Sequence, residues 1–250
     1  MGTSKIINRF LAVGLLIWGM TQAAQASVVL AGTRVVYNAA EPEATLRLSN
    51  EGKSPALVQA WIDDGNAKAN PEALDVPFTI APPVARIDPG KAQTLRISYT
   101  GEPLPQDRES VFWLNVLEIP PKAAPDEEGA NKLQLAFRSR IKLFFRPAGL
   151  KGRAEEAPAQ LGWRLVQAKG HPAVEVSNPT PYNVTLASFD VVSVGKKAES
   201  EESAMVRPGE KRLMPLKGNV PAGETSKVIY RFINDYGGET TGEAPLQAPQ

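Results

Sequence analysis

Apolar and polar residues alternate strictly along residues 133–147, whose sequence is LQLAFRSRIKLFFRP. The odd positions are apolar except Ser139, and the even positions include Gln134, Arg138, Arg140, Lys142 and Arg146. A period of two predicts a β-strand. A strand in a sandwich usually covers about 5 or 6 residues. The longer run therefore either crosses a whole domain or presents part of itself to another molecule.

Shorter runs with the same character fill the chain on both sides of this segment. Before it stand VVLAGTRVVY, ATLRLS, ALVQAWI, QTLRISY and VFWLNVLEI, separated by turn signals such as Asp88-Pro89-Gly90. After the hinge sequence RPAGLKGR follow LGWRLVQ, AVEVSN, YNVTLASFDVV, KRLMPL and TSKVIYRFI. The pattern predicts an all-β protein made of two immunoglobulin-like β-sandwich domains, residues 27–147 and residues 148–238.

Three segments lack the strand pattern. Lys122 to Lys132 and Gly195 to Ser203 are polar and poor in strand formers, so we expect them to be mobile hairpin loops. Residues 239–250 also have no strand pattern, and we expect a disordered tail there.

The first 26 residues have the features of a signal peptide. Lys5 and Arg9 form a cationic start, Phe10 to Met20 are largely apolar, and Ala24-Gln25-Ala26 is a small-residue cleavage site. A membrane anchor needs about 20 apolar residues, and this run is shorter. We therefore predict that the chain is exported and that the mature chain begins at Ser27.

Composition argues against several classes of function. Loss of the first 26 residues changes the formal charge from +1 to −1, which gives no bulk reason to bind nucleic acid or acidic lipid. The chain has no cysteine, so burial alone must stabilise its domains. The single histidine, His171, lies in a Gly-His-Pro turn, and no GxSxG, HExxH or GxxxxGK[ST] motif occurs. The sequence indicates neither an enzyme nor a cofactor or metal site.

Two cations stand out because they interrupt apolar strands. Arg34 lies between Thr33 and Val35, and Lys142 lies between Ile141 and Leu143. Together they suggest a cleft for an anion. The alternative is that each lies on a solvated strand face and binds nothing specific.

Five sequence blocks resemble a known family. They are PFTIAPPVARIDPGKAQTLRI (77–97), DRESVFWLNVLEIPP (107–121), RSRIKLFFRP (138–147), SNPTPYNVTL (177–186) and INDYGG (233–238). In this order they resemble the PapD-like periplasmic chaperones of the chaperone–usher pathway. The resemblance implies an L-shaped pair of domains and a client, a pilus subunit that lacks the last strand of its own sandwich. It also implies delivery of that client to an outer-membrane usher, without ATP or another cofactor.

The resemblance assigns roles to residues of the long strand and its neighbours. Arg34 and Lys142 match the cations that bind the C-terminal carboxylate of the client. Leu133, Leu135 and Phe137 match the alternating side chains that the chaperone donates to the client groove. The alternative for these three is the chaperone's own core, which better explains the apolar residues further along the strand, Ile141, Leu143 and Phe145.

Glu109, Arg146 and Asp235 match an ion network between the two domains, which the family uses to set the interdomain angle. We expect this network to orient the domains more than to stabilise them, because desolvation offsets much of the attraction. The segment Lys122 to Lys132 is short and lacks cysteine, which is typical of the short-loop branch that builds pilus rods.

Two other classes of protein remain open at this point. An exported pilin or adhesin would also be β-rich, but it would be a single incomplete sandwich. A sugar-binding accessory domain would expose aromatic side chains, whereas Trp61, Trp113 and Trp163 occupy apolar strand patterns typical of cores. An uncovered apolar edge also leaves open a self-capping homodimer in the absence of client.

Overall fold

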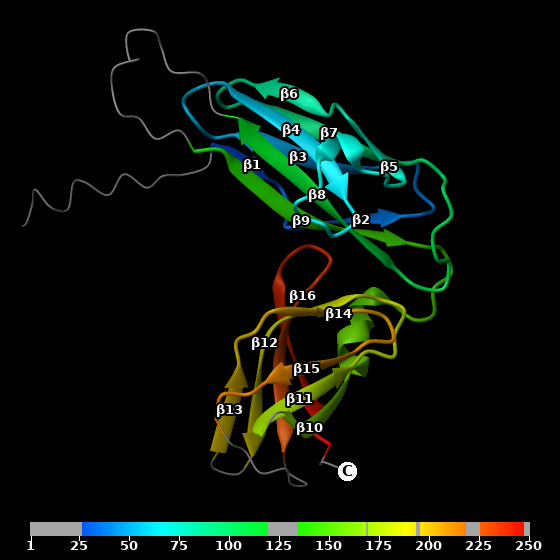
Figure 1. Cartoon of the computed structure of the whole chain (residues 1–250), viewed down its shortest axis with the longest axis vertical. Coiled ribbons are helices and arrows are strands. Elements are labelled where there is room, and N and C mark those ends of the chain that lie inside the picture. Colours follow the sequence, from blue (N-terminus) through cyan, green and yellow to red (C-terminus); the bar gives the residue numbers. More distant parts are fainter. Residues whose placement is uncertain (1–26, 120–134, 169, 194–195, 219–225, 248–250) are drawn as a thin grey trace, which may run out of the picture.

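The computed structural model describes residues 27–119, 135–168, 170–193, 196–218 and 226–247. It is built almost entirely of strands, which form two separate β-sandwich domains (Figure 1). The all-β, two-domain fold class predicted from the sequence is confirmed. The expected signal peptide, the Lys122 to Lys132 loop and Leu133 lie outside the described residues.

The N-terminal domain contains two sheets packed face to face. Their strand orders are β1-β3-β7-β5 and β2-β9-β8-β4-β6. The elements are β1 (Val28–Leu30), β2 (Arg34–Asn38), β3 (Ala44–Asn50), β4 (Ala56–Asp63), η1 (Pro71–Ala73), β5 (Phe78–Ala81), β6 (Val84–Ile87), β7 (Ala92–Tyr99), β8 (Ser110–Ile119) and β9 (Phe137–Arg146).

Apolar residues at every second position of these strands form the N-terminal core. Leu48 and Leu95 from one sheet meet Leu114 and Leu143 from the other, and all four are fully buried. One predicted run needs correction: VVLAGTRVVY forms two strands. The chain crosses between the sheets at residues 31–33, so β1 pairs with β3 whereas β2 pairs with β9. A continuous apolar run does not reveal such a crossing.

The C-terminal domain is a second sandwich. Its sheets have the orders β10-β11-β15 and β13-β12-β16-β17, with β14 also paired to β12. Trp163, Phe189 and Tyr230 fill its core, and Trp163 stacks on Tyr230 with ring centroids 5.2 Å apart. The elements are η3 (Ala154–Gln160), β10 (Gly162–Ala168), β11 (His171–Ser177), β12 (Val184–Ser193), β13 (Lys196–Ser200), β14 (Ala204–Val206), β15 (Lys211–Pro215), β16 (Lys227–Ile233) and β17 (Glu239–Pro245).

Two of the expected irregular segments are strands. The prediction of a disordered tail after residue 238 is wrong for β17, which pairs with β16 along its whole length. Gly242 stands opposite Tyr230 there, and a side chain at this position would collide with the Tyr230 ring. The loop expected from Gly195 to Ser203 contains β13, whose Ala198 and Ser200 point inward while its charged residues face solvent. Both are edge strands, which backbone pairing stabilises without a strong apolar pattern.

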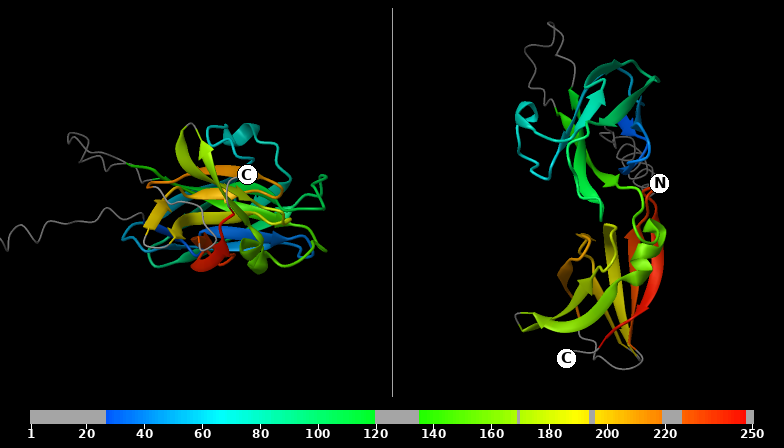
Figure 2. Two further views of the ribbon diagram at one scale, coloured as in Figure 1. Left: turned by 90° about the horizontal axis from the view of Figure 1, so that it is seen from below. Right: turned by 90° about the vertical axis from the view of Figure 1, so that its right-hand side faces the viewer.

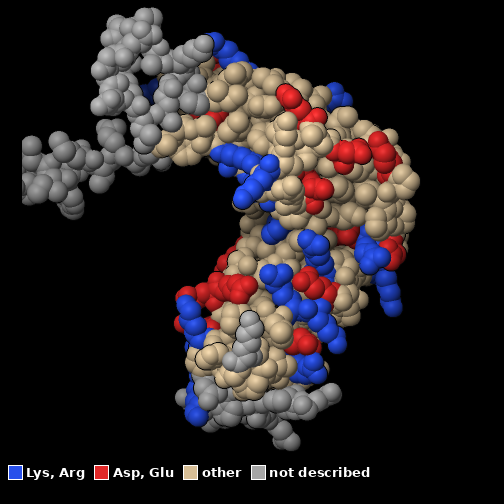
Figure 3. All heavy atoms as spheres, in the orientation of Figure 1, with Lys and Arg blue, Asp and Glu red and all other residues tan. Residues whose placement is uncertain are grey.

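The two domains meet at an angle, and the molecule is hollowed on one side (Figures 1 and 3). Lys and Arg side chains gather along part of this hollow (Figure 3). Near the junction the chain passes from β9 through Pro147 into η3, while the hairpin between β16 and β17 reaches back to the N-terminal domain (Figure 2). Among the described residues, no helix is long and apolar enough to cross a membrane.

Candidate functional site

Arg34 and Lys142 lie side by side at the junction of the two domains. They are opposite partners in the parallel pairing of β2 with β9, so their side chains leave the sheet on the same face. Arg34 Nη1 donates a hydrogen bond of 2.9 Å to the Ile233 carbonyl, and Lys142 Nζ lies 3.4 Å from Thr185 Oγ1. Both cations therefore point toward the C-terminal domain.

The two positive charges are only weakly compensated in the free protein. Within the described part of the chain, neither cation forms an ion pair with a carboxylate, and the buried Nε of Arg34 has no hydrogen-bond partner. Burial lowers the pKa of Lys142 below its ordinary value of 10.5, and the charge of Arg34 lowers it further. Burial likewise lowers the pKa of Arg34, although Asp235 and Glu109 oppose the shift. Such a pair favours the binding of an anion.

An ion network spans the junction beside these cations. Arg146 Nε donates to Glu109 Oε1 at 2.7 Å, and Arg146 Nη1 donates to Asp235 Oδ2 at 2.8 Å. Glu109 Oε2 accepts a hydrogen bond of 2.8 Å from the backbone amide of Asn183. Burial lowers the pKa of Arg146, but the bonds and charges of Asp235 and Glu109 outweigh it and leave the pKa raised. Groups from both domains thus meet on one guanidinium.

The hairpin that carries Asp235 also makes a close contact with the N-terminal domain. Gly237 has a φ of +83°, and a Cβ at this position would collide with Thr33 Oγ1. Only glycine combines this backbone conformation with so close an approach. The hairpin is therefore fixed against the N-terminal domain next to Arg34.

Strand β9 leaves half of one edge uncovered. Residues Lys142–Phe145 pair with β2 on one side and β8 on the other, but among the described residues 137–141 pair only with β8. Along the odd-numbered face, Leu143 and Phe145 are buried, whereas Leu135 is 52% exposed and Phe137 is 38% exposed. Leu135 and Phe137 are thus not part of the core. Regular strand begins at Phe137, four residues later than the sequence pattern suggested.

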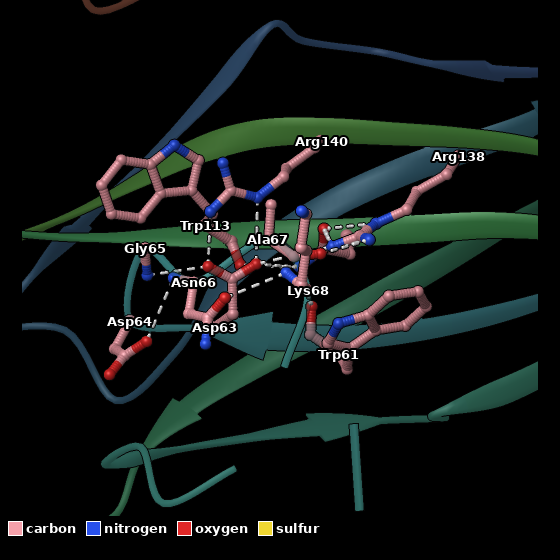
Figure 4. Close-up of polar contacts among 11 residues, drawn as sticks. Trp61, Asp63, Asp64, Gly65, Asn66, Ala67, Lys68, Trp113, Arg138 and Arg140 are labelled. Carbon is pink, nitrogen blue, oxygen red and sulfur yellow. Dashed lines mark hydrogen bonds and ion pairs between the residues drawn. The ribbon is translucent and has the colours of Figure 1, made fainter. Parts of the chain in front are cut away.

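The even-numbered face of β9 holds a cluster that the sequence analysis missed (Figure 4). Trp61 and Trp113, expected in the core, lie on the outer face of the sheet, while Trp163 alone of the three is fully buried. Arg138 covers the ring of Trp61 and Arg140 covers that of Trp113. The signal was present in ALVQAWID, because Trp61 shares the parity of the polar residues Gln59 and Asp63.

The fold and the site define a class: a two-domain pilus-assembly chaperone. Residues 27–151 match the family model described as "Pili and flagellar-assembly chaperone, PapD N-terminal domain", and residues 156–244 match "Pili assembly chaperone PapD, C-terminal domain". The chain belongs to this PapD-like family of fimbrial periplasmic chaperones in the chaperone–usher pathway. The family is not enzymatic, and the resemblance found in the sequence is confirmed.

Individual relatives agree with the family assignment. Chaperone protein FimB/FhaD of Bordetella pertussis is 50% identical over 231 residues, which cover 91% of each chain. The crystal structure of the YadV chaperone superimposes with a TM-score of 0.73 and 42% identity, covering 88% of this chain and 99% of that one. A complex of the Salmonella enterica SafA pilin with the SafB chaperone gives a TM-score of 0.73 at 31% identity, covering 90% and 98%.

Proposed function

We propose that this chain works in the periplasm, where it captures pilus subunits by lending them the uncovered edge of β9. The client is a subunit whose sandwich lacks its last strand and therefore exposes an apolar groove. Leu133, Leu135 and Phe137 enter that groove, Arg34 and Lys142 bind the client's C-terminal carboxylate, and the complex is delivered to an outer-membrane usher. The observation that carries the proposal concerns the described residues: half of one edge of β9 is open there, and the two cations beside it have no carboxylate partner.

The geometry of β9 supports a defined direction for the client strand. β9 runs from the open segment at Phe137 toward the paired segment at Lys142. A client that ends in a carboxylate at Lys142 and pairs along residues 137–141 must run in the same direction, so the pairing is parallel. The open segment spans about 17 Å from Phe137 to Lys142 at roughly 3.3 Å per residue. That length accommodates a strand of ordinary size.

The carboxylate contact and the apolar contacts contribute differently to client binding. A charge-assisted hydrogen bond contributes about 1.5 to 3 kcal/mol, so the carboxylate anchor fixes the register of the client. The odd side chains of β9 then bury apolar surface in the groove, and each fully buried side chain of this size contributes roughly 1.5 to 3 kcal/mol. Arg146, Glu109 and Asp235 hold the two domains at the angle that keeps the cations accessible.

Co-expression with a pilin in the periplasm tests the proposal. A tagged chaperone is isolated and the proteins that accompany it are identified by mass spectrometry, with the same pilin expressed alone for comparison. We expect a stoichiometric complex, and degradation or aggregation of the pilin in the absence of chaperone. A pilin that accumulates equally well alone, or that never accompanies the chaperone, contradicts the proposal.

A further inference from the structure

The open segment of β9 has few of the contacts that usually hold a strand in place. Within the described chain, residues 137–141 have one neighbouring strand, β8, where a central strand has two. On the odd face, Phe137 is 38% exposed and only Ile141 packs against the N-terminal core. Edge segments with so few anchors tend to fray. The other side-chain contacts of this segment are made by its even-numbered residues, Arg138 and Arg140.

Arg138 is bound on that face chiefly by a neutral amide, and its Nη2 also lies 3.7 Å from Asp63 Oδ2 in a longer ion pair. Its Nε and Nη2 donate to Asn115 Oδ1 at 2.9 and 2.7 Å, and its Nη1 donates to the Ala67 carbonyl at 2.8 Å (Figure 4). Asn115 belongs to β8 and is fully buried. The guanidinium also lies 4.9 Å from the centre of the Trp61 ring on β4. A single side chain of the open segment is thus tied to two further strands and to the loop that follows β4.

Arg140 is bound by a buried carboxylate. Its Nε and Nη2 donate to the two oxygens of Asp63 at 3.0 and 2.5 Å, and its guanidinium lies 4.7 Å from the centre of the Trp113 ring. Asp63 is 1% exposed and also accepts a bond of 2.8 Å from Asn115 Nδ2, which joins the two halves of the cluster. Burial alone would raise the pKa of Asp63, but the bonds from Arg140, Asn115 and the Gly65 amide outweigh it and hold the pKa below its ordinary value. The carboxylate is therefore charged at neutral pH.

The cluster lies on the face of β9 opposite the side chains that the client would take up. Successive residues of a strand point to opposite faces, so Arg138 and Arg140 point away from the side on which Leu135 and Phe137 are exposed. A client that takes up the odd side chains and the free backbone edge leaves the cluster undisturbed. Bidentate guanidinium contacts also fix direction as well as distance.

We propose that Asp63, Asn115, Arg138 and Arg140 are positioning residues that hold residues 137–141 extended and in register on β8 before the client arrives. This inference rests on the proposed function, because it assumes that the segment is the one lent to the client. Ordering a flexible strand opposes binding through lost conformational entropy. A segment that is ordered beforehand avoids this loss, and client capture is faster and tighter.

Arg138→Met is the first test variant, because its closest polar partners, Asn115 Oδ1 and the Ala67 carbonyl, are neutral. The buried Asp63 lies 3.7 Å from Arg138 Nη2 but keeps its shorter ion pair with Arg140 in this variant. The double variant Asp63→Asn with Arg140→Met removes the ion pair as a unit. Arg86→Met is the matched control, since Arg86 lies on the outer face of the same sheet, forms an ion pair with Asp88, and has a side chain that is 70% exposed. Amide hydrogen exchange, followed by mass spectrometry, compares residues 137–141 with residues 142–146 in the client-free proteins.

We expect exchange in residues 137–141 to accelerate at least ten-fold in both test variants, with residues 142–146 unchanged. Capture of a co-expressed pilin should slow at least ten-fold in parallel, whereas Arg86→Met behaves as wild type. Unchanged exchange in 137–141, exchange that rises equally throughout the N-terminal domain, or normal capture despite a loosened segment overturns the inference. Wild-type protein that captures no pilin, or Lys142→Met that captures it normally, would instead refute the proposed function itself.

Discussion

Removal of the Lys142 ammonium should separate client binding from stability. Lys142→Met keeps the length of the side chain and most of its packing but deletes the charge. In the free protein this charge is partly buried and lies beside Arg34, and among the described residues its one side-chain hydrogen bond is to Thr185 Oγ1 at 3.4 Å. A lysine whose folded pKa lies below its unfolded value disfavours folding while it is charged. This penalty falls as the pH rises through the lowered pKa and is absent above 10.5. At neutral pH we therefore expect the melting temperature to stay the same or to rise.

The affinity for the client should fall, although the melting temperature does not. Loss of one charge-assisted bond to the client carboxylate removes about 1.5 to 3 kcal/mol, which corresponds to a roughly ten- to hundred-fold weaker complex. The assay measures the dissociation constant for one pilin together with the melting temperature of the free chaperone. Lys227→Met serves as control, because Lys227 is an exposed lysine paired with Glu243 on the neighbouring strand. Equal affinity for wild type and variant, or a fall in melting temperature that matches the loss of binding, would refute the reasoning.

Two further predictions concern the junction and the start of the chain. Glu109→Gln removes the buried carboxylate that pairs with Arg146, and it should lower the free energy of unfolding by about 1 to 3 kcal/mol. The angle between the domains, measured by small-angle scattering, should also widen. An unchanged angle would show that Asp235 and the Gly237 contact are enough to fix it. Material isolated from the periplasm should begin at Ser27 when its N-terminus is sequenced, and a start more than a few residues away would exclude the predicted cleavage site.

Much of the fold follows from elementary patterns in the sequence. Most strands could be predicted from the alternation of apolar and polar residues, because each sandwich buries one face of every strand. In β3, for example, Leu46 and Leu48 are buried while Thr45 and Arg47 are exposed. The family resemblance then assigned Glu109, Arg146 and Asp235 to one network, and they do lie in contact although Asp235 is 89 positions from Arg146 in the sequence. No local pattern could have joined them.

The errors have physical causes. β17 lacks an apolar pattern because it is an edge strand of sequence ETTGEAP, held by backbone pairing to β16. Trp61 and Trp113 read as core residues because tryptophan is usually buried, but guanidinium groups can cover an indole ring as well as apolar side chains do. Parity within the strand, which places Trp61 with Asp63, was the better guide than residue type.

Substitution with glutamate along the start of the long strand tests the central claim most directly. Leu135→Glu and Phe137→Glu each place an unpaired carboxylate in the client's apolar groove, at several kcal/mol, whereas Ala136→Glu points away from that groove. All three positions are exposed in the free chaperone, so its melting temperature should hardly change. The measurement is the yield of one pilin in the periplasm with each variant. The account predicts that yield collapses for Leu135→Glu and Phe137→Glu and persists for Ala136→Glu; equal effects at the three positions would contradict it.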